Sequence, residues 1–481
     1  MGFRTILTII GALLATLGVT MLIPAMIDAL AGNDDWRVFF ACSLITTLFG
    51  AGLWASSSGH VEPLSLRQAF LLTTLVWIVL TLFSALPFMW SDLHASFTDA
   101  VFESISGFTT TGSTVLVGLD NMPPGILMWR AILQWLGGLG IVVMSIAVLP
   151  MLSVGGMQMF KAEAFETPDK ILPRAANIAG GMVAIYSILT LVCALLYWMS
   201  GMSLFDAVAH SMTTLATGGY STKDASLGAY ESHAIEYIAV VFMILGATPF
   251  ALFLAATAGQ VSRLWKDSQL RAFLGLIALG TALAFWMQTS ANLHHGEEAF
   301  RHAIFSVVSV MTGTGFGNAD YNAWGPAPVA LFFILTFLGG CTGSTSCGIK
   351  VFRFQVLAKD LAQHVSRVLM PSRVYIKRFN GMPLTDDVSR SVQAFVFLYI
   401  VCFLIEAVLL GLAGLDPVTA LSGAATTISN VGPGLGPIIG PAGNFAPLSD
   451  FVKWVMSVSM LVGRLEVLVV LVLLSPRFWR G

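Results

Sequence analysis

Short amphipathic stretches that end in a cluster of threonine, glycine or asparagine recur along this chain. The four copies lie at 99–114, 206–222, 302–320 and 416–436. Aligning them brings one glycine of each copy into register, namely Gly112, Gly219, Gly315 and Gly432. Similarity that recurs at a period of roughly 100 residues indicates internal duplication of one structural unit.

Long apolar runs flank each amphipathic stretch. Each repeat is therefore predicted to contain an outer span, a half-length helix with its loop, and an inner span. The expected segments are 66–90, 97–114 and 123–150 in repeat one, 176–200, 203–222 and 233–260 in repeat two, 270–290, 298–320 and 326–364 in repeat three, and 389–412, 416–436 and 448–475 in repeat four. Two further apolar runs, 3–30 and 36–56, precede the repeats. The pattern predicts about ten membrane crossings and four re-entrant loops.

Each half-length helix ends at polar, glycine-containing backbone at membrane depth. The run from Asp99 to Phe108 would be about 15 Å long, half of a hydrocarbon core. Asp99, Asp206 and Asp416 stand where helix N-caps are expected. Non-helical backbone survives at that depth only when it is buried in protein or lines water. Four such segments around one axis would place carbonyls and threonine hydroxyls at the negative ends of helix dipoles, which suits a desolvated monovalent cation.

Composition and charge place the chain in a membrane. Of its 481 residues, 56% are hydrophobic and 10% are charged, whereas soluble domains carry about 25% charge. We predict an all-α polytopic membrane protein with units at 1–60 (two leading helices), 61–155, 156–262, 263–368 and 369–481 (four pore repeats). Most of the 24 Lys and Arg residues fall in links on one side, which predicts cytoplasmic termini and loops that open outward.

The inner spans contain a second aligned set of small residues. Gly137, Gly246, Gly339 and Gly463 occupy equivalent mid-span positions. In repeat three the glycine begins the run GGCTGSTSCGIK, which should not remain helical within an apolar span. We interpret this run as a gate beneath the cation site. The residues assigned to the gate are Gly339, Gly340, Thr342, Gly343, Ser344, Thr345, Ser346, Gly348, Lys350 and Arg464.

Arg464 follows the mid-span glycine of repeat four, where the other repeats have a small residue. An arginine at the membrane centre costs at least about 2.5 kcal/mol, so it must face water or a protein partner. We expect it to project into the pore beside the gate loop and to donate hydrogen bonds to loop carbonyls. The alternative interpretation is a structural salt bridge with Glu466 or Glu406.

The sequence resembles the TrkH/TrkG/KtrB superfamily of potassium-translocating membrane subunits along essentially its whole length. The motifs that carry the resemblance are GFTTTG, ATGGYST, TGTGFGNADY and NVGPGLGP at the four loops, then GGCTGSTSCGIK and VGRLEVL in inner spans. The two leading spans favour the TrkH branch. The resemblance implies a four-repeat, potassium-channel-like pore in each subunit. It also implies a homodimer in the bacterial inner membrane and a cytosolic, TrkA-like nucleotide-binding partner.

The fourfold register predicts a selectivity filter that binds K⁺. Its expected residues are Thr110, Thr111, Gly112, Thr217, Gly218, Gly219, Gly313, Thr314, Gly315, Asn430, Val431 and Gly432. Backbone carbonyls of the first two residues in each set would bind the ion. The glycines would hold the loop shape, with positive φ where a side chain is not tolerated.

The leading functional prediction is a K⁺ uptake pore with an intramembrane gate under the control of the cytosolic partner. A proton- or sodium-coupled K⁺ symporter is the alternative, and the sequence leaves it open. No Ser/His/Asp set, HExxH motif or paired aspartate stands at membrane depth, so we do not expect an enzyme. We expect no organic cofactor and no nucleic-acid partner. His210 and His302 are expected to make structural hydrogen bonds, while the roles of Glu103 and Glu466 stay open.

Overall fold

The computed structural model describes residues 3–59, 64–147, 156, 171–372 and 376–480. The described chain is mainly helical, with one small antiparallel pair, β1 (Arg378–Phe379) and β2 (Met382–Pro383). Seven of its helical segments are long and apolar enough to cross a membrane, and a bent helix pair makes an eighth candidate. The mainly helical, multi-pass architecture expected from the sequence is therefore confirmed, although the described residues contain seven or eight such segments and not the ten predicted.

Two leading spans pack against each other at glycines. The first consists of α1 (Arg4–Thr20) and α2 (Leu22–Ala31), and the second is α3 (Trp36–Ser57). A methyl group added at Gly50 would lie 2.4 Å from the backbone nitrogen of Ala15, and one at Gly18 would lie 2.6 Å from that of Thr47. Small residues let these backbones approach closely, as is common for helices in membranes.

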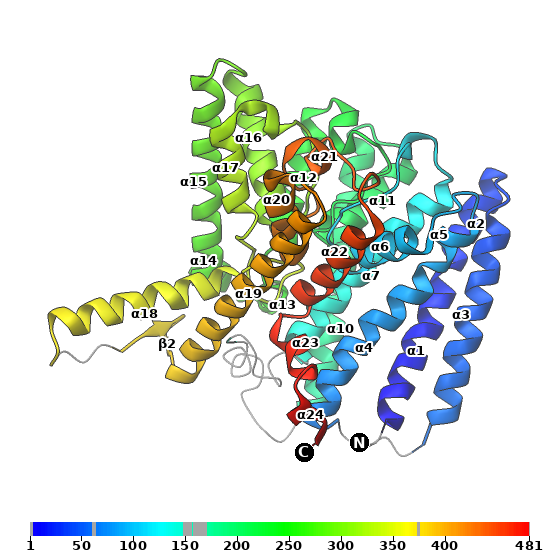
Figure 1. Cartoon of the computed structure of the whole chain (residues 1–481), viewed down its shortest axis with the longest axis horizontal. Coiled ribbons are helices and arrows are strands. Elements are labelled where there is room, and N and C mark those ends of the chain that lie inside the picture. Colours follow the sequence, from blue (N-terminus) through cyan, green and yellow to red (C-terminus); the bar gives the residue numbers. More distant parts are fainter. Residues whose placement is uncertain (1–2, 60–63, 148–155, 157–170, 373–375, 481) are drawn as a thin grey trace.

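The four repeats follow in chain order. Repeat one contains α4 (Leu66–Ser84), α5 (Leu86–Trp90), α6 (Phe97–Phe108) and α7 (Pro124–Ala147). Repeat two contains α10 (Ile171–Met199), α11 (Leu204–Leu215), α12 (His233–Gly246), α13 (Phe250–Thr257) and α14 (Ser262–Lys266), and repeat three contains α15 (Ser268–Ser290), α16 (Gly296–Met311), α17 (Pro326–Leu335) and α18 (Val351–Leu369). Repeat four contains α19 (Asp386–Leu412), α20 (Pro417–Ser429), α21 (Gly436–Ile439), α22 (Asp450–Arg464), α23 (Leu468–Leu473) and α24 (Pro476–Arg480). The half-length helices are α6, α11, α16 and α20. Both chain ends lie at the same end of the molecule, opposite the α15–α16 connection (Figure 1).

The inner spans are less continuous than the sequence predicts, although the non-helical run expected in repeat three is present. α7 runs unbroken through its glycine pair, but α12 and α13 meet at an angle of 90° around Pro249. The single span predicted at 326–364 is wrong. α17 ends at Leu335, residues 336–350 form a loop, and α18 is an amphipathic helix that projects from the body of the molecule (Figure 1). The glycine, serine and threonine run has too little helix propensity to join them.

The fourth inner span also breaks. α22 ends at Arg464 and α23 begins at Leu468, with positive φ at Glu466 and Val467. Three of the four inner spans thus lose helical structure at the depth of the aligned glycines. The proposed boundary between the first two repeats, at 155 and 156, lies next to residues outside the described chain.

Candidate ion pathway

Three of the four half-length helices are capped at their N-terminal ends by short polar side chains, whereas His295 before α16 makes no capping hydrogen bond. In α20 the Asp416 carboxylate accepts from the backbone nitrogens of Val418 and Thr419, each at 3.1 Å, as expected. Hydrogen bonds from Thr419 and from the backbone of Val418 lower the pKa of this carboxyl group. Asp99 and Asp206 are not N-caps, contrary to the prediction. Ser96 and Ser203 cap α6 and α11 instead, because each serine accepts from the backbone of the aspartate three residues later.

The four loops share one unusual backbone pattern. The residue two before each aligned glycine has positive φ: Thr110 at 53°, Thr217 at 49°, Gly313 at 74° and Asn430 at 52°. The aligned glycines also have positive φ: Gly112 at 87°, Gly219 at 78°, Gly315 at 79° and Gly432 at 109°. Threonine rarely adopts this conformation. Threonine nevertheless adopts positive φ at the equivalent positions Thr110 and Thr217, which indicates that the surrounding structure of each repeat imposes the loop conformation.

The loops close into a ring. A methyl group added at each aligned glycine would fall 1.8 to 2.8 Å from the carbonyl oxygen of the preceding position in the next repeat. The pairs are Gly112 with Gly218, Gly219 with Thr314, Gly315 with Val431, and Gly432 with Thr111. The four repeats therefore follow one another around an axis in chain order. All four glycines also line one cavity of about 80 Å³.

Behind the ring, buried polar residues hold the loops of repeats one and two together. Arg130 pairs with Glu103 at 2.8 Å and donates to the Ser221 carbonyl at 2.8 Å. Its guanidinium also lies 4.0 Å from the centre of the Tyr220 ring. Gln134 donates to the Gly218 carbonyl at 2.7 Å. Sequence reasoning did not select Arg130, Gln134 or Tyr220, although polar side chains in an apolar span were an available signal.

Repeats three and four have different supports. Glu236 pairs with Arg301 at 2.5 Å and accepts from Asn318 at 2.6 Å. In repeat four the Asn430 amide donates to the Thr111 hydroxyl at 2.9 Å and to the Met460 carbonyl at 2.8 Å. Each loop thus has the same backbone shape but is held by its own set of side chains.

The aligned inner-span glycines let the inner helices touch the ends of the half-length helices. A methyl group at Gly137 would lie 1.9 Å from the Phe108 carbonyl, the last of α6, and one at Gly463 would lie 2.0 Å from the Ile428 carbonyl, in the last turn of α20. At Gly246 the corresponding distance, to the Leu215 carbonyl, is 2.9 Å. Repeat three departs from this pattern, because a methyl group at Gly339 would lie 1.9 Å from the Cys347 carbonyl within its own loop.

The loop 336–350 crosses directly beneath the ring. The Thr345 hydroxyl donates to the Leu215 carbonyl at 3.0 Å and to the Gly246 carbonyl at 2.9 Å. The Thr217 hydroxyl lies 3.2 Å from that of Thr345, so the loop contacts a residue of the ring. Seven of the residues predicted for the gate belong to this buried loop: Gly339, Gly340, Thr342, Ser344, Thr345, Ser346 and Lys350. Gly343 and Gly348 belong to the same loop and are partly exposed.

Arg464 lies against this loop. Its Nη1 donates to the Thr345 carbonyl at 3.2 Å and also contacts the Cys347 sulfur. Its Nη2 donates to the Gly137 carbonyl at 3.4 Å, so one guanidinium links repeats one, three and four. The alternative salt bridges are not formed, because Glu466 pairs with Arg353 and Glu406 accepts from Thr427 and Ser459.

The remaining candidate residues occupy distinct environments. Glu103 and Glu466 are each in a buried ion pair, with Arg130 and Arg353. His210 makes the expected structural hydrogen bonds, to the Asp206 carbonyl at 2.8 Å and the Ser221 hydroxyl at 2.9 Å. His302 differs, because its buried Nδ1 has no hydrogen-bond partner within the described chain.

Comparison with known proteins agrees with this geometry. The family model TrkH, described as a cation transport protein, matches residues 36–480. The Trk system potassium uptake protein TrkI of Halomonas elongata is 45% identical over 99% of this chain and 96% of that protein. TrkH of Vibrio parahaemolyticus is 40% identical over the full length of both proteins. The crystal structure of the potassium transporter TrkH from Vibrio parahaemolyticus superposes with a TM-score of 0.92, at 39% identity and full coverage of both chains. The chain therefore belongs to the TrkH family of cation transport proteins, which are membrane transporters rather than enzymes.

Proposed function

We propose that this chain is a potassium uptake pore with one four-loop filter and one intramembrane gate. The observation that carries the proposal is the closed ring of four loops with the same two left-handed backbone positions in each. Full-length relatives named potassium uptake proteins support the choice of ion. The proposal keeps the pore repeats at 61–155, 156–262, 263–368 and 369–481.

In this proposal K⁺ is held by backbone carbonyls of the four loops. The filter residues are Thr110, Thr111, Gly112, Thr217, Gly218, Gly219, Gly313, Thr314, Gly315, Asn430, Val431 and Gly432. The carboxyl end of each half-length helix points its dipole toward the ion. Carbonyls replace the hydration shell of the ion, so a loop shape common to the four repeats is needed for coordination. The carbonyl of Gly218 is also bonded to Gln134, which orients that loop.

The gate of this proposal is the loop 339–350 with Arg464 and Lys350. The loop hydrogen bonds to the end of α11 through Thr345, and Arg464 binds the same segment from the neighbouring repeat four. A buried guanidinium on the ion path repels K⁺ and stabilises the loop in this position. Opening then requires that the loop lose these few hydrogen bonds, which a partner-driven movement of α18 could cause because α18 follows the loop directly.

We further propose a cytosolic TrkA-like partner, a homodimer, and an inner-membrane location with both termini in the cytoplasm. The relatives are named as parts of a Trk system, which supports a multi-component assembly. α18 projects from the body and exposes Leu361, Val368 and Leu369, which suits a protein contact (Figure 1).

The segment between α18 and α19 contains three basic residues, Arg373, Lys377 and Arg378, of the kind that electrostatic docking of the partner would use. Lys377 is buried and pairs with Asp360 at 2.8 Å, so it is not available for that role. Arg373 lies outside the described residues. Among the basic residues of this region, Arg367 and Arg378 are exposed and are the better candidates for contact with the partner.

A coupled K⁺ symporter is the second candidate function. It is favoured by Glu406, a carboxylate that is 4% exposed and bonded to the hydroxyls of Thr427 and Ser459. No ion pair of Glu406 is formed within the described chain. A buried acid without a cationic partner is a common proton site in carriers.

The decisive experiment measures K⁺ uptake by cells that lack their own K⁺ uptake systems, and by vesicles, with and without the cytosolic partner. The proposal expects uptake that saturates with K⁺ and responds to the partner. In vesicles the reversal potential should follow the K⁺ gradient and ignore an imposed pH or Na⁺ gradient. A reversal potential that moves with pH or Na⁺ would select the symporter instead.

A further inference from the structure

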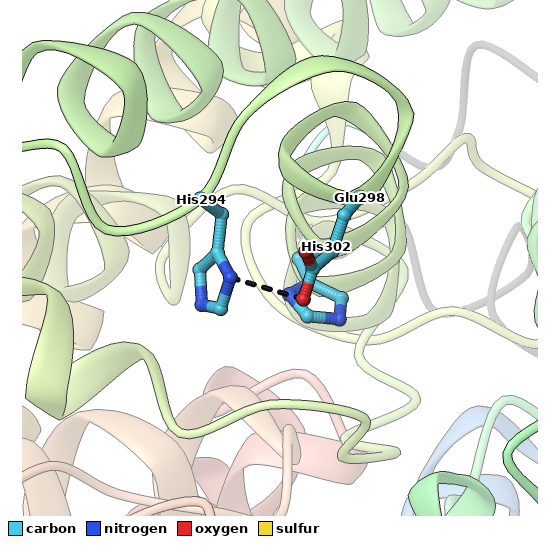
Figure 2. Close-up of side chains that lie close together, drawn as sticks. All are labelled: His294, Glu298 and His302. Carbon is cyan, nitrogen blue, oxygen red and sulfur yellow. Dashed lines mark ion pairs between the residues drawn. The ribbon is translucent and has the colours of Figure 1, made fainter.

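The connection between α15 and α16 contains a cluster of metal-ligating side chains outside the ion pathway. His294, Glu298 and His302 each offer one ligand atom, and these atoms all lie within 4.8 Å of one another. Figure 2 shows His294 on the connection facing Glu298 and His302, which stand one turn apart on α16. Residues four apart lie on the same face of a helix, so the spacing presents both side chains to His294.

The cluster is already partly arranged for a cation. The His294 Nδ1 lies 3.1 Å from a carboxylate oxygen of Glu298. Ligand atoms around a tetrahedral zinc ion are about 3.4 Å apart at usual bond lengths. Since no two ligand atoms of the cluster are more than 4.8 Å apart, they need to approach by at most roughly 1.4 Å, a shift on the scale of a side-chain rotamer change.

One ring nitrogen of the cluster has no hydrogen-bond partner among the described residues. The Nδ1 of His302 is buried and has no hydrogen-bond partner in the described part of the chain. A buried polar atom without a partner is costly, and coordination would satisfy it. The rings of His294 and His302 lie with their centres 4.9 Å apart and nearly perpendicular, so both can direct a nitrogen to one point.

The surrounding charges permit a divalent cation. Arg301 is adjacent in sequence, but its guanidinium is bound by Glu236 at 2.5 Å and by Glu297 at 3.1 Å. These two carboxylates balance its charge, while Glu298 adds a negative charge within the cluster. The positive end of the α16 dipole opposes a cation, and Glu297 and Glu298 in its first turn offset that effect.

We propose that His294, Glu298 and His302 form a binding site for a first-row transition-metal ion such as Zn²⁺ at the outer end of repeat three. Two imidazoles and one carboxylate select zinc, copper or nickel over magnesium and calcium, which prefer all-oxygen sites. Three protein ligands leave one position for water. The bound ion fastens the α15–α16 connection to the helix that leads to Gly313 and Gly315.

The test is titration of the purified full-length protein with Zn²⁺ in competition with a chromophoric chelator. One Zn²⁺ per chain is expected, with binding at least tenfold weaker in His294→Gln and Glu298→Gln. His295→Gln is the matched control, because this exposed neighbour lies outside the cluster and should bind as the parent does. Excess Ca²⁺ should not displace the ion. X-ray absorption spectroscopy at the zinc edge should report two imidazole nitrogen ligands, with oxygen atoms as the other ligands.

Zn²⁺ should also raise the thermal unfolding temperature of the parent and of His295→Gln, and should leave that of His294→Gln unchanged. His294→Gln removes a partly exposed side chain from a connection, so it keeps the test valid if His302→Gln fails to fold. Equal Zn²⁺ binding in the parent and His294→Gln would overturn the proposal. Such a result would mean that other residues, for example cysteines, hold the metal. Absence of stoichiometric Zn²⁺ binding by the parent would overturn it as well.

Discussion

The outer and inner halves of the proposed ion pathway differ in how similar the four repeats are to one another. In the outer half, four loops repeat the same backbone angles and meet in a closed ring. In the inner half, the four repeats diverge at equivalent positions. α7 continues, α12 bends by 90° into α13, α17 gives way to a loop, and α22 ends at Arg464.

This difference follows from what each half must do. Coordination of a dehydrated ion by backbone carbonyls needs similar geometry from every repeat, whatever side chains support it. Closing a pathway needs only one movable segment and one group that holds it. Repeat three supplies the segment and repeat four supplies the arginine. In the proposed pore, duplication followed by divergence below the ring would therefore place a symmetric ion-binding site above an asymmetric gate.

The largest expected effect comes from breaking the symmetry of the ring with Gly219→Ser. The new Cβ would lie 1.8 Å from the Thr314 carbonyl, at a φ of 78° that serine rarely adopts. We expect the K⁺ over Na⁺ permeability ratio to fall at least tenfold, about 1.4 kcal/mol of selectivity. Bi-ionic reversal potentials in planar bilayers measure this ratio.

Gly118→Ser is the matched control for that variant. Gly118 has a φ of 79° but has nothing within 4 Å of an added Cβ. The added side chain imposes similar backbone strain but meets no atom of a neighbouring repeat, so selectivity should be unchanged. Equal losses in both variants would contradict the role assigned to the ring.

Removal of the arginine that holds the gate should have the next largest effect. Arg464→Gln deletes the charge and the bonds to the Thr345 and Gly137 carbonyls. Hydrogen bonds to charged groups contribute about 1.5 to 3 kcal/mol, so basal K⁺ flux should rise roughly tenfold to a hundredfold. Stopped-flow flux from vesicles without the partner provides the measurement.

Lys453→Gln is the control for this variant, because it tests whether removing any buried cationic side chain from α22 raises basal K⁺ flux. Lys453 is 5% exposed and pairs with Asp99 at 2.6 Å, but it does not contact the loop. Its flux should remain near that of the parent. A lower yield of Arg464→Gln with no gain in flux would mean that the arginine is structural.

A smaller effect is expected from Thr345→Val. The substitution keeps the shape of the side chain but removes the hydroxyl that bonds to the Leu215 and Gly246 carbonyls. A loss of about 1 kcal/mol should raise basal flux roughly fivefold. Thr342→Val is the control within the same loop, because the Thr342 hydroxyl has no partner in the described chain. Identical fluxes in the two variants would argue against the gate.

The smallest effect is expected at Glu406. Glu406→Gln keeps an acceptor oxygen for one of the two hydroxyls, those of Thr427 and Ser459, presents an amide NH₂ to the other, and removes the titratable group. For a passive pore, flux should change by less than about twofold, and the reversal potential should stay at the K⁺ equilibrium value across a pH gradient. A loss of pH-driven K⁺ accumulation in this variant would instead show coupling to protons.

The symmetric half of the pathway was the part that the sequence could predict. A backbone position that needs positive φ favours glycine in every repeat, so aligning the repeats identifies it, as at Gly112 and Gly432. Arg464 was accessible by a different argument, because a charge at membrane depth requires a partner. The same argument applied to Arg130 would have found the buried pair with Glu103 behind the ring.

The breaks in the inner spans were predicted only in part, because the loop of repeat three was expected but the breaks after α12 and α22 were not. Pro249 marks the bend after α12, and the glycine-rich run marks the loop of repeat three. The break after Arg464 involves positive φ at Glu466 and Val467, residues that carry no local signal for it. Tertiary contacts, such as the ion pair of Glu466 with Arg353, impose that conformation. The caps at Ser96 and Ser203 were missed because serine and aspartate three residues apart can each occupy the N-cap.

The most direct test of the central claim is the K⁺ over Na⁺ permeability ratio of Arg464→Gln, measured by bi-ionic reversal potential in the same bilayers that report its raised flux. If the ring sets selectivity and the inner half sets only access, the ratio should equal that of the parent while the flux rises. A ratio that falls toward one as the flux rises would contradict the separation of filter and gate.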